Sequence, residues 1–304
     1  MLLQRTLAAI AISSLFIGSM WGDYYWLHDS LLLHFVFLGF TFLAYREFWA
    51  LCRAAHEQTY SIWGTSCGMI FVAAHYLAMR HISQYQTFFA LQNANDLLSG
   101  ILAGAVMGAF FLAARRGQYE AALGSLGCLC LGLFYLSFLP CFVLKIRHLG
   151  TDGLPGGAHW NDFGQKMVIA TIVVAKRCDI FAYLIGRFVG RHKAFPHLSP
   201  GKTIEGVAAG LGGSLGLAFL LRWGVLGVLP ESHFSVASTC IFGLVIGLSG
   251  MMGDLAESLL KRSAGVKDAG HTIPGFGGVL DVIDSLTIAG PVAYFLIPVI
   301  INRL

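Results

Sequence analysis

Acidic side chains gather in one stretch near the C-terminal end of the chain. Of sixteen Asp and Glu residues, five fall between positions 254 and 284: Asp254, Glu257, Asp268, Asp281 and Asp284. Asp254 and Glu257 are three positions apart, as are Asp281 and Asp284, so each pair shares one face of a helix. Two carboxylate pairs brought together repel each other unless a cation lies between them, and hard oxygen ligands suit Mg²⁺. The pattern therefore predicts a site for Mg²⁺ or a similar ion, held in part by substrate phosphates.

Basic side chains are interleaved with these acids and also occupy the preceding polar connection. Metal and cations together suit a nucleoside triphosphate, because the metal neutralises the reacting phosphate while basic groups hold the rest and stabilise the departing pyrophosphate. The alternative is that these residues only follow the excess of Lys and Arg on the cytoplasmic side of membrane proteins. The candidates are Lys261, Arg262 and Lys267 within the acidic stretch, and Arg191, His192, Lys193 and Lys202 before it, together with the hydroxyl of Ser199.

The residues from Ser199 to Thr203 read S-P-G-K-T and so end like a phosphate-binding P-loop. They do not fit that motif, because Pro196 stands where its first Gly is required and no strand is predicted before it. The alternative is a loop from Pro196 to Thr203 that caps the next helix through Ser199 or Thr203. A helix N-terminus of this kind, with Lys202 beside it, can still contact phosphate.

Charged side chains also interrupt an apolar segment at residues 166–190, which contains Lys176, Arg177, Asp179 and Arg187. Charges in a membrane helix are costly and usually face a partner or a watery cavity. Asp179 therefore either neutralises Lys176 one turn away or lines a cavity beside the carboxylates.

The elements that must position these groups are membrane helices. The 304 residues are 56% hydrophobic and 12% charged, whereas soluble domains have about 25% charged residues. Several uncharged runs are long enough to cross ~30 Å of hydrocarbon. Such runs form helices, because unpaired backbone groups are not tolerated in lipid. The predicted fold is an all-α, polytopic transmembrane protein.

Apolar windows predict about nine spans. They are residues 6–21, 31–45, 61–79, 97–114, 121–143, 166–190, 204–228, 236–253 and 285–301. The first window also has the outline of a signal peptide, but in a chain of many spans it is interpreted as an anchor. Lys and Arg gather mostly in the connections on the side of the N-terminus, which places that end in the cytoplasm. We therefore divide the chain into N-terminal transmembrane helices, 1–150, and a catalytic transmembrane region, 151–304, with cytoplasmic loops at 191–203 and 254–284.

The remaining composition gives few further signals. The seven cysteines contain no C-x-x-C pair and lie mostly in apolar stretches, which predicts buried small side chains and neither disulfides nor metal ligands. The net charge of +4 is small and dispersed, so a nucleic-acid partner is not expected. Glycines four apart, such as Gly206 with Gly210, Gly212 with Gly216 and Gly243 with Gly247, predict close helix packing.

The polar residues from 258 to 284 follow the order of a long signature, approximately S-x-x-K-R-x(4)-K-D-x(5)-P-G-H-G-G-x(2)-D-R-x-D. The matching residues are Ser258, Lys261, Arg262, Lys267, Asp268, Pro274, Gly275, Gly277, Gly278, Asp281 and Asp284. Agreement continues upstream, among others at Asp179, Arg187, Ser199, Lys202, Thr203, Asp254 and Glu257. In these residues, over about 175 to 290, the sequence resembles the phosphatidate cytidylyltransferase (CDP-diglyceride synthase) family. Two positions depart from it: Phe276 replaces a His, and Val282 replaces an Arg.

The resemblance implies a multi-pass enzyme of the bacterial inner membrane that makes CDP-diacylglycerol and pyrophosphate from CTP and phosphatidic acid, for phospholipid synthesis. It implies Mg²⁺, alone or together with a second cation, and it suggests a homodimer. The implied metal ligands are Asp268, Asp281 and Asp284, with Asp254 and Glu257 close by. The implied catalytic cations are Lys261, Arg262 and Lys267, and the implied substrate-binding residues are Ser199, Lys202, Thr203, Ser258, Asp179 and Arg187.

Other functions share part of this chemistry. A CTP-dependent lipid or polyprenol kinase needs a similar site but releases CDP, and the changes at Phe276 and Val282 are compatible with a cytidylyltransferase for another membrane lipid. A transporter could line its path with Lys176, Asp179 and Arg187. Transport predicts acids at the bilayer midplane and repeated halves, whereas this sequence gathers its acids at one membrane face and has no repeat.

Overall fold

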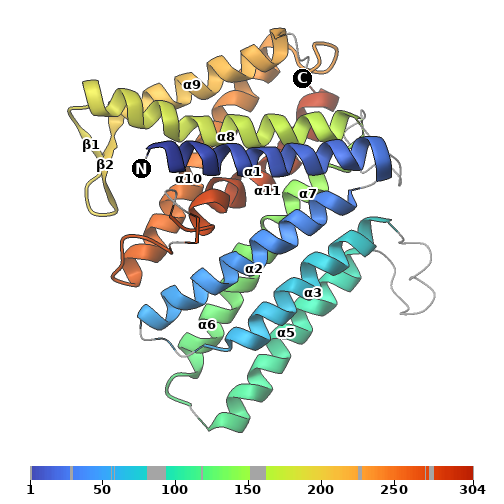
Figure 1. Ribbon diagram of the computed structural model, residues 1–304, viewed down its shortest axis with the longest axis vertical. Coiled ribbons are helices and arrows are strands. Elements are labelled where there is room, and N and C mark those ends of the chain that lie inside the picture. The colour runs from blue at the N-terminus through green and yellow to red at the C-terminus, as the bar shows by residue number, and fades with distance from the viewer. Residues whose placement is uncertain are drawn as a thin grey trace. The chain divides into compact units, whose positions relative to one another are not determined.

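Helices make up most of the structure, as the composition predicts (Figure 1). The computed structural model describes residues 2–27, 30–55, 57, 59–80, 94–117, 119–150, 162–224, 228–270, 272–273 and 277–303. These residues form two units, one made of the described residues of 1–141 and 263–281, the other of those of 142–262 and 282–303. The all-α class predicted from the composition is confirmed.

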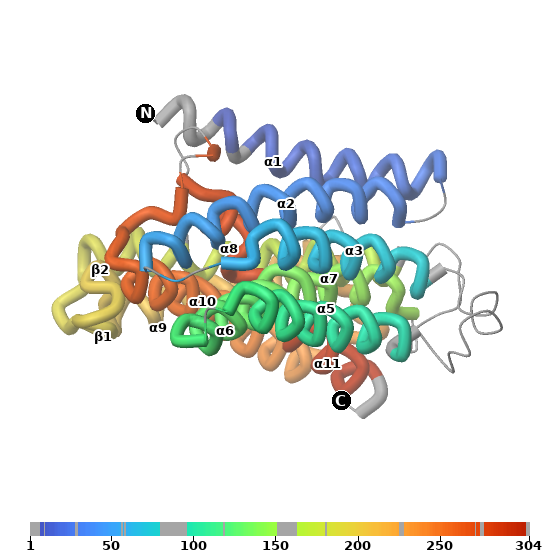
Figure 2. The backbone as a smooth tube through the Cα atoms, turned by 90° about the horizontal axis from the view of Figure 1, so that it is seen from below, coloured from blue at the N-terminus to red at the C-terminus, as the bar shows by residue number. Residues whose placement is uncertain are grey.

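The first unit is a layer of long helices. They are α1 (Leu2–Gly22), α2 (Leu31–Ala54), α3 (Ser61–Arg80), α5 (Ala94–Arg116) and α6 (Ala122–Gly132), with π-helical stretches at Asp23–Leu27 and Leu133–Phe138. Helix α3 packs between α2 and α5, and the three run side by side in both views (Figures 1 and 2). The core side chains Tyr45, Phe48 and Phe71 are fully buried.

Polar contacts fix the start and the interior of α2. The buried carboxylate of Asp23 accepts hydrogen bonds from the backbone N–H groups of Leu32 at 2.8 Å and Leu33 at 2.9 Å. The first N–H groups of a helix have no hydrogen-bond acceptor within that helix. The Asp23 carboxylate, which precedes α2 in the chain, accepts from two of them. Further along, the Tyr45 hydroxyl is 2.8 Å from Ser137 Oγ and donates to the Gly132 carbonyl oxygen at 3.2 Å. These bonds connect α2 to the π-helical stretch that follows α6.

The second unit begins within α7 (Cys141–Ile146), at Phe142. It contains α8 (Asp162–Val189), β1 (Lys193–Phe195), β2 (Ser199–Thr203), α9 (Ile204–Trp223), α10 (Val236–Ser263) and most of α11 (Leu280–Arg303). Helices α8 and α9 are joined by the antiparallel hairpin of β1 and β2, in which Lys193 pairs with Thr203 and Phe195 with Ser199. The two helices therefore pack against each other along much of their length.

Seven helices are long and apolar enough to cross a membrane. They lie at Leu31–Ala54, Ser61–Met79, Asp96–Arg116, Ala122–Ile146, Ile204–Trp223, Val236–Ser263 and Leu280–Ile301. The other two predicted spans, 6–21 and 166–190, also fold as helices, α1 and α8, but are not among the seven found in the described residues. Helix α8 carries too many charged side chains to qualify. The chain is a multi-pass membrane protein; a count of nine spans and a cytoplasmic N-terminus stay predictions.

Two segments predicted as loops contain regular structure. Helix α10 continues to Ser263, ten residues beyond the predicted span, and α11 begins at Leu280, so that much of 254–284 is helical. The window at 236–253 ended too early because apolar periodicity stops where the charged residues begin. The connection at 191–203 forms the β1–β2 hairpin, whose two short strands pair with each other.

The predictions for the small residues are largely confirmed. All seven cysteines are free, and each is buried or half-buried. Gly206 and Gly210 lie against the backbone of α8, and Gly243 and Gly247 lie against α9. The prediction for Gly212 and Gly216 is wrong, because these glycines have no heavy atom of the described residues within 4 Å of an added Cβ. They lie on the face of α9 turned away from its partner helices.

Candidate functional site

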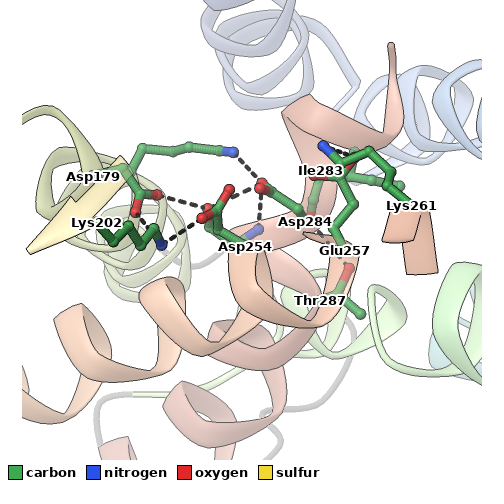
Figure 3. Close-up of polar contacts among 10 residues, drawn as sticks. Asp179, Lys202, Asp254, Glu257, Lys261, Ile283, Asp284 and Thr287 are labelled. Carbon is green, nitrogen blue, oxygen red and sulfur yellow. Dashed lines mark hydrogen bonds and ion pairs between the residues drawn. The ribbon is translucent and has the colours of Figure 1, made fainter. Parts of the chain in front are cut away.

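Four acidic and three basic side chains from four elements meet in the second unit (Figure 3). They are Lys176 and Asp179 from α8, Lys202 from β2, Asp254, Glu257 and Lys261 from α10, and Asp284 from α11. Asp254, Glu257 and Lys261 follow one another at helical spacing, so that a single face of α10 supplies three of the seven groups. The name acid–lysine cluster is used below for these seven residues.

Each lysine of the cluster is paired with a carboxylate. Lys176 Nζ donates to Asp284 Oδ1 at 2.6 Å, and Lys261 Nζ is 3.2 Å from Glu257 Oε1. Lys202 Nζ forms an ion pair with Asp254 and lies 3.7 Å from Asp179 Oδ1. Four carboxylates and three ammonium groups therefore nearly balance in charge.

Asp179 does not neutralise Lys176, which was one of the two alternatives for this residue. Lys176 pairs instead with Asp284 of α11. Asp179 turns toward Lys202 and accepts a hydrogen bond of 3.4 Å from Ser285 Oγ. Lys176 and Asp179 of α8 thus both face carboxylates or their partners, whereas a cavity lined by Asp179 stays a prediction.

Three carboxylates of the cluster are close enough to share one cation. Oxygens of Asp254, Glu257 and Asp284 all lie within 4.8 Å of one another; Glu257 and Asp284 are buried and Asp254 is half-buried. Ligands about 2.1 Å from a Mg²⁺ ion lie up to about 4.2 Å apart, so the three oxygens need only a small inward movement to share an ion. A set of hard oxygen donors of this kind suits Mg²⁺.

Glycines allow the helices that carry these carboxylates to touch. A Cβ added at Gly253 of α10 would lie 2.3 Å from the Asp284 carbonyl oxygen and 2.8 Å from Ser285 Cα of α11. At Gly250, one turn earlier, the same atom would lie 2.7 Å from the Ala175 carbonyl oxygen of α8. The glycines of α10 therefore hold Asp284 and the charged face of α8 against Asp254 and Glu257.

The hairpin places Lys202 through contacts at the start of α9. The Thr203 hydroxyl accepts a hydrogen bond from the Gly206 N–H at 3.1 Å and caps α9, as predicted. Glu205 accepts from the backbone N–H of Arg191 at 3.1 Å, and one of its oxygens is 2.6 Å from His192 Nδ1. These bonds hold both strands of the hairpin on α9, with Lys202 one residue before the cap.

Several other predicted residues of the second unit lie outside the acid–lysine cluster. Arg187 is exposed and donates to the Tyr183 hydroxyl at 3.2 Å, on the same helix. Arg262 is exposed and reaches the Leu198 carbonyl oxygen of the hairpin at 3.5 Å. Ser199 of β2 and Ser258 of α10 are half-buried. Val282, where the family signature has Arg, is half-buried on α11.

The predicted residues of the first unit lie on the signature segment that joins α10 to α11. Lys267 and Asp268 are exposed, and Asp281 accepts a hydrogen bond of 2.7 Å from the Gly278 N–H. Pro274, Gly275 and Phe276 of the signature lie outside the described residues, as does His271.

One buried acid that holds this segment was not predicted. Glu47 of α2 is 5% exposed, and its carboxylate accepts hydrogen bonds from the backbone N–H groups of Val279 and Leu280, each at 2.9 Å. It also accepts from Thr272 Oγ1 at 2.5 Å. Glu47 therefore caps the start of α11 from another helix, where the helix dipole also favours a negative charge. The only feature of the sequence that could have indicated Glu47 is its position among the aromatic residues between Tyr45 and Trp49.

The fold and this site together define a multi-pass membrane protein whose acid–lysine cluster suits phosphate chemistry. The chain belongs to the cytidylyltransferase family, whose model matches residues 3–300. The match extends well beyond the 175–290 stretch recognised from the signature.

Similar proteins carry a more specific name. A phosphatidate cytidylyltransferase of Synechocystis is 34% identical over 60% of this chain and 67% of its own length. Phosphatidate cytidylyltransferase 5, chloroplastic, of Arabidopsis thaliana is 36% identical over 64% of this chain and 50% of its own length. A phosphatidate cytidylyltransferase of Bacillus subtilis is 32% identical over 56% and 58%. The chain thus spans about half to two thirds of the length of these relatives.

Substitution of Gly253 by Ala is expected to separate α10 from α11. Its methyl group would meet the Asp284 backbone, which cannot rotate away, so Asp284 moves relative to Asp254 and Glu257. A displacement of about 1 Å in a catalytic site can reduce the rate about a hundredfold, and we expect a loss of that order in turnover. Gly212→Ala is the matched control, because its added methyl group meets open space among the described residues. Equal activity of the two variants would contradict this account of α10.

Substitution of Glu47 by Gln is expected to destabilise the start of α11. The side chain keeps its size but loses its charge, and its amide group now faces backbone donors; hydrogen bonds to a charged group contribute about 1.5–3 kcal/mol each. The measurement is thermal unfolding in detergent, with exposed Glu120→Gln of the same unit as control. An unchanged unfolding temperature for Glu47→Gln would show that the capping bonds contribute nothing.

Proposed function

We propose that this chain transfers CMP from CTP to phosphatidic acid, giving CDP-diacylglycerol and pyrophosphate for phospholipid synthesis. The observation that carries the proposal is the acid–lysine cluster, in a chain of the cytidylyltransferase family. The names of the similar proteins support phosphatidic acid as the acceptor. A lipid substrate also fits a protein built of membrane helices, because the substrate never has to leave the bilayer.

The cation that fits the carboxylates is Mg²⁺, held by Asp254, Glu257 and Asp284. When bound, a divalent ion neutralises phosphate charge and polarises the phosphoryl oxygens. Asp268 and Asp281 are proposed as additional ligands, for this ion or a second one, on the evidence of the signature. The protein's part is to hold oxygens of several acids at the distance that one ion requires.

Lys176, Lys202 and Lys261 are proposed to hold the triphosphate and the departing pyrophosphate. Each already lies next to a carboxylate, so each can exchange that partner for a phosphate oxygen without a large movement. Arg262 and Lys267, both exposed, are proposed to extend this binding, as are Ser199, Thr203, Ser258 and Arg187. Preformed positive charge at the leaving group lowers the barrier because it costs no reorganisation during the reaction.

The reaction needs no general base. An oxygen of the phosphatidate phosphate forms a bond to the α-phosphorus of CTP while the bond from that phosphorus to the β-phosphate bridge breaks, and the electron pair leaves with pyrophosphate. A phosphate monoester has a second pKa of about 6, so the attacking oxygen already carries its charge at neutral pH. Phe276, where the signature has His, therefore removes no base that the nucleophile requires.

We place the protein in the inner membrane of a bacterium, with the acid–lysine cluster on the side where CTP is made. The orientation rests on the basic residues of the connections, and the bacterial inner membrane rests on the resemblance. A homodimer, suggested by the resemblance, stays a prediction. The similar proteins do not favour a CTP-dependent kinase, and analysis of the products separates the two activities, because a kinase releases CDP instead of pyrophosphate.

The full chain, purified in detergent with CTP, Mg²⁺ and phosphatidic acid, is expected to release CDP-diacylglycerol and pyrophosphate in equal amounts. Asp284→Asn and Asp281→Asn are each expected to lower turnover about a hundredfold or more, since each removes a charge from the proposed site. Asp96→Asn, at the start of α5 in the first unit, is the matched control. Absence of both products with the parent chain would reject phosphatidic acid as the substrate.

Removal of divalent ions with a chelator is expected to abolish turnover, and addition of Mg²⁺ is expected to restore it. Without a cation, the carboxylates and the triphosphate repel each other. Binding of Mg²⁺ to the parent chain and to Asp284→Asn can be compared by calorimetry, which does not depend on turnover. Equal affinity in the two proteins would exclude Asp284 as a ligand.

A further inference from the structure

A cavity of about 610 Å³ lies entirely within the first unit. Its walls come from the C-terminal half of α2, the first turns of α3 and the signature segment at Ala269, Gly270 and Thr272. This volume is within the range of small-molecule sites, roughly 300–1,000 Å³. The acid–lysine cluster belongs to the second unit, so the role proposed for that cluster leaves this cavity without an occupant.

Two arginines on one face of α2 line the cavity. Arg46 and Arg53 are seven positions apart, which is about two helical turns, and both are exposed. Neither forms an ion pair with any part of the chain that the structure describes. Glu47, between them in sequence, directs its carboxylate to Thr272 and the start of α11 instead. The lining therefore carries a net positive charge, and its one acid already accepts several hydrogen bonds.

The same cavity has hydroxyl and apolar side chains. Ser61, Thr65 and Ser66 of α3 contribute hydroxyl groups. Thr65 accepts a hydrogen bond from Trp49 Nε1 at 2.9 Å and still has its own O–H to donate. Phe42 and Ile62 also line the cavity and are 46% and 84% exposed. These apolar side chains belong to α2 and α3, two of the helices that are apolar enough to cross a membrane.

We propose that this cavity binds the phosphate headgroup of phosphatidic acid, with Arg46 and Arg53 on the phosphate and the acyl chains along Phe42 and Ile62. The proposal rests on the function proposed above and locates its lipid substrate. Arginine suits a phosphate monoester because its planar guanidinium group donates two parallel hydrogen bonds. A headgroup here lies beside the signature segment, directly after Asp268.

A lipid fits the cavity better than the nucleotide does. A nucleobase is usually held by stacking on aromatic faces, but Trp49 of this lining is 2% exposed and offers none, which leaves Phe42, beside the aliphatic Ile62. The exposed apolar side chains face the surroundings of two membrane helices, where acyl chains are available and water is not. An amphiphile with a charged phosphate matches both halves of the lining.

The test compares Arg46→Gln/Arg53→Gln with Arg115→Gln/Arg116→Gln, which removes the same charge from the end of α5 in the same unit. Binding of dioleoyl phosphatidate and of dioleoyl phosphatidylglycerol to the full chain in mixed micelles is measured without CTP. Loss of two charge-assisted contacts is expected to weaken phosphatidate binding about a hundredfold, and phosphatidylglycerol binding far less. The control double variant is expected to stay within about twofold of the parent. Thermal unfolding and gel filtration show whether both variants are folded.

Steady-state kinetics gives a second measurement. The KM for phosphatidate is expected to rise in the Arg46/Arg53 variant, with the KM for CTP within about twofold of the parent value.

Unchanged phosphatidate binding, a rise in the KM for CTP alone, or an equal loss of phosphatidylglycerol binding would each overturn the proposal. If the parent chain binds phosphatidate through these arginines but produces no CDP-diacylglycerol, the cavity stands and the proposed reaction fails. If turnover is normal and the variant binds phosphatidate like the parent, the reaction stands and the cavity is rejected.

Discussion

The second unit depends on the balance between four carboxylates and three lysines on otherwise apolar helices. Each charge withdrawn from water costs several kcal/mol unless it is paired. Pairing links the elements: Lys176 joins α8 to α11, and Lys202 joins the hairpin to α8 and α10. Because the groups nearly compensate one another in charge, any phosphate that enters must bring its cation or displace a carboxylate from a lysine.

This balance requires close backbone contact as well as charge. Gly250 and Gly253 let α10 lie directly on α8 and α11, so that short side chains such as Asp284 can reach the acids of α10. Larger residues would keep the helices apart, and an aspartate could then no longer span the gap. The hairpin has a similar requirement, since Glu205 and Thr203 hold it on α9 and thereby fix Lys202.

Much of the acid–lysine cluster could be predicted from the sequence, because helical spacing places Asp254 and Glu257 on one face and like charges need a cation. The lysine partners could not be predicted. Lys176 and Asp284 are 108 positions apart, and one sequence contains no information on which distant charges pair. The extension of α10 to Ser263 was missed because hydropathy does not detect a helical turn made of charged residues. The β1–β2 hairpin was missed because its strands are too short to give a hydropathy pattern. Whether Asp268 and Asp281 bind metal, as the signature implies, stays a prediction.

Glu47 has a consequence for the order in which the protein is built. Its partners at Val279 and Leu280 follow it by 232 and 233 positions, so α2 enters the membrane long before the donors for its carboxylate are synthesised. Contacts so distant in sequence form late, after the loop-closure entropy has been overcome. Until the last helix arrives, the first unit holds a carboxylate whose two backbone donors are missing. The start of α11 therefore supplies the last polar partners of a unit whose other helices are synthesised long before it.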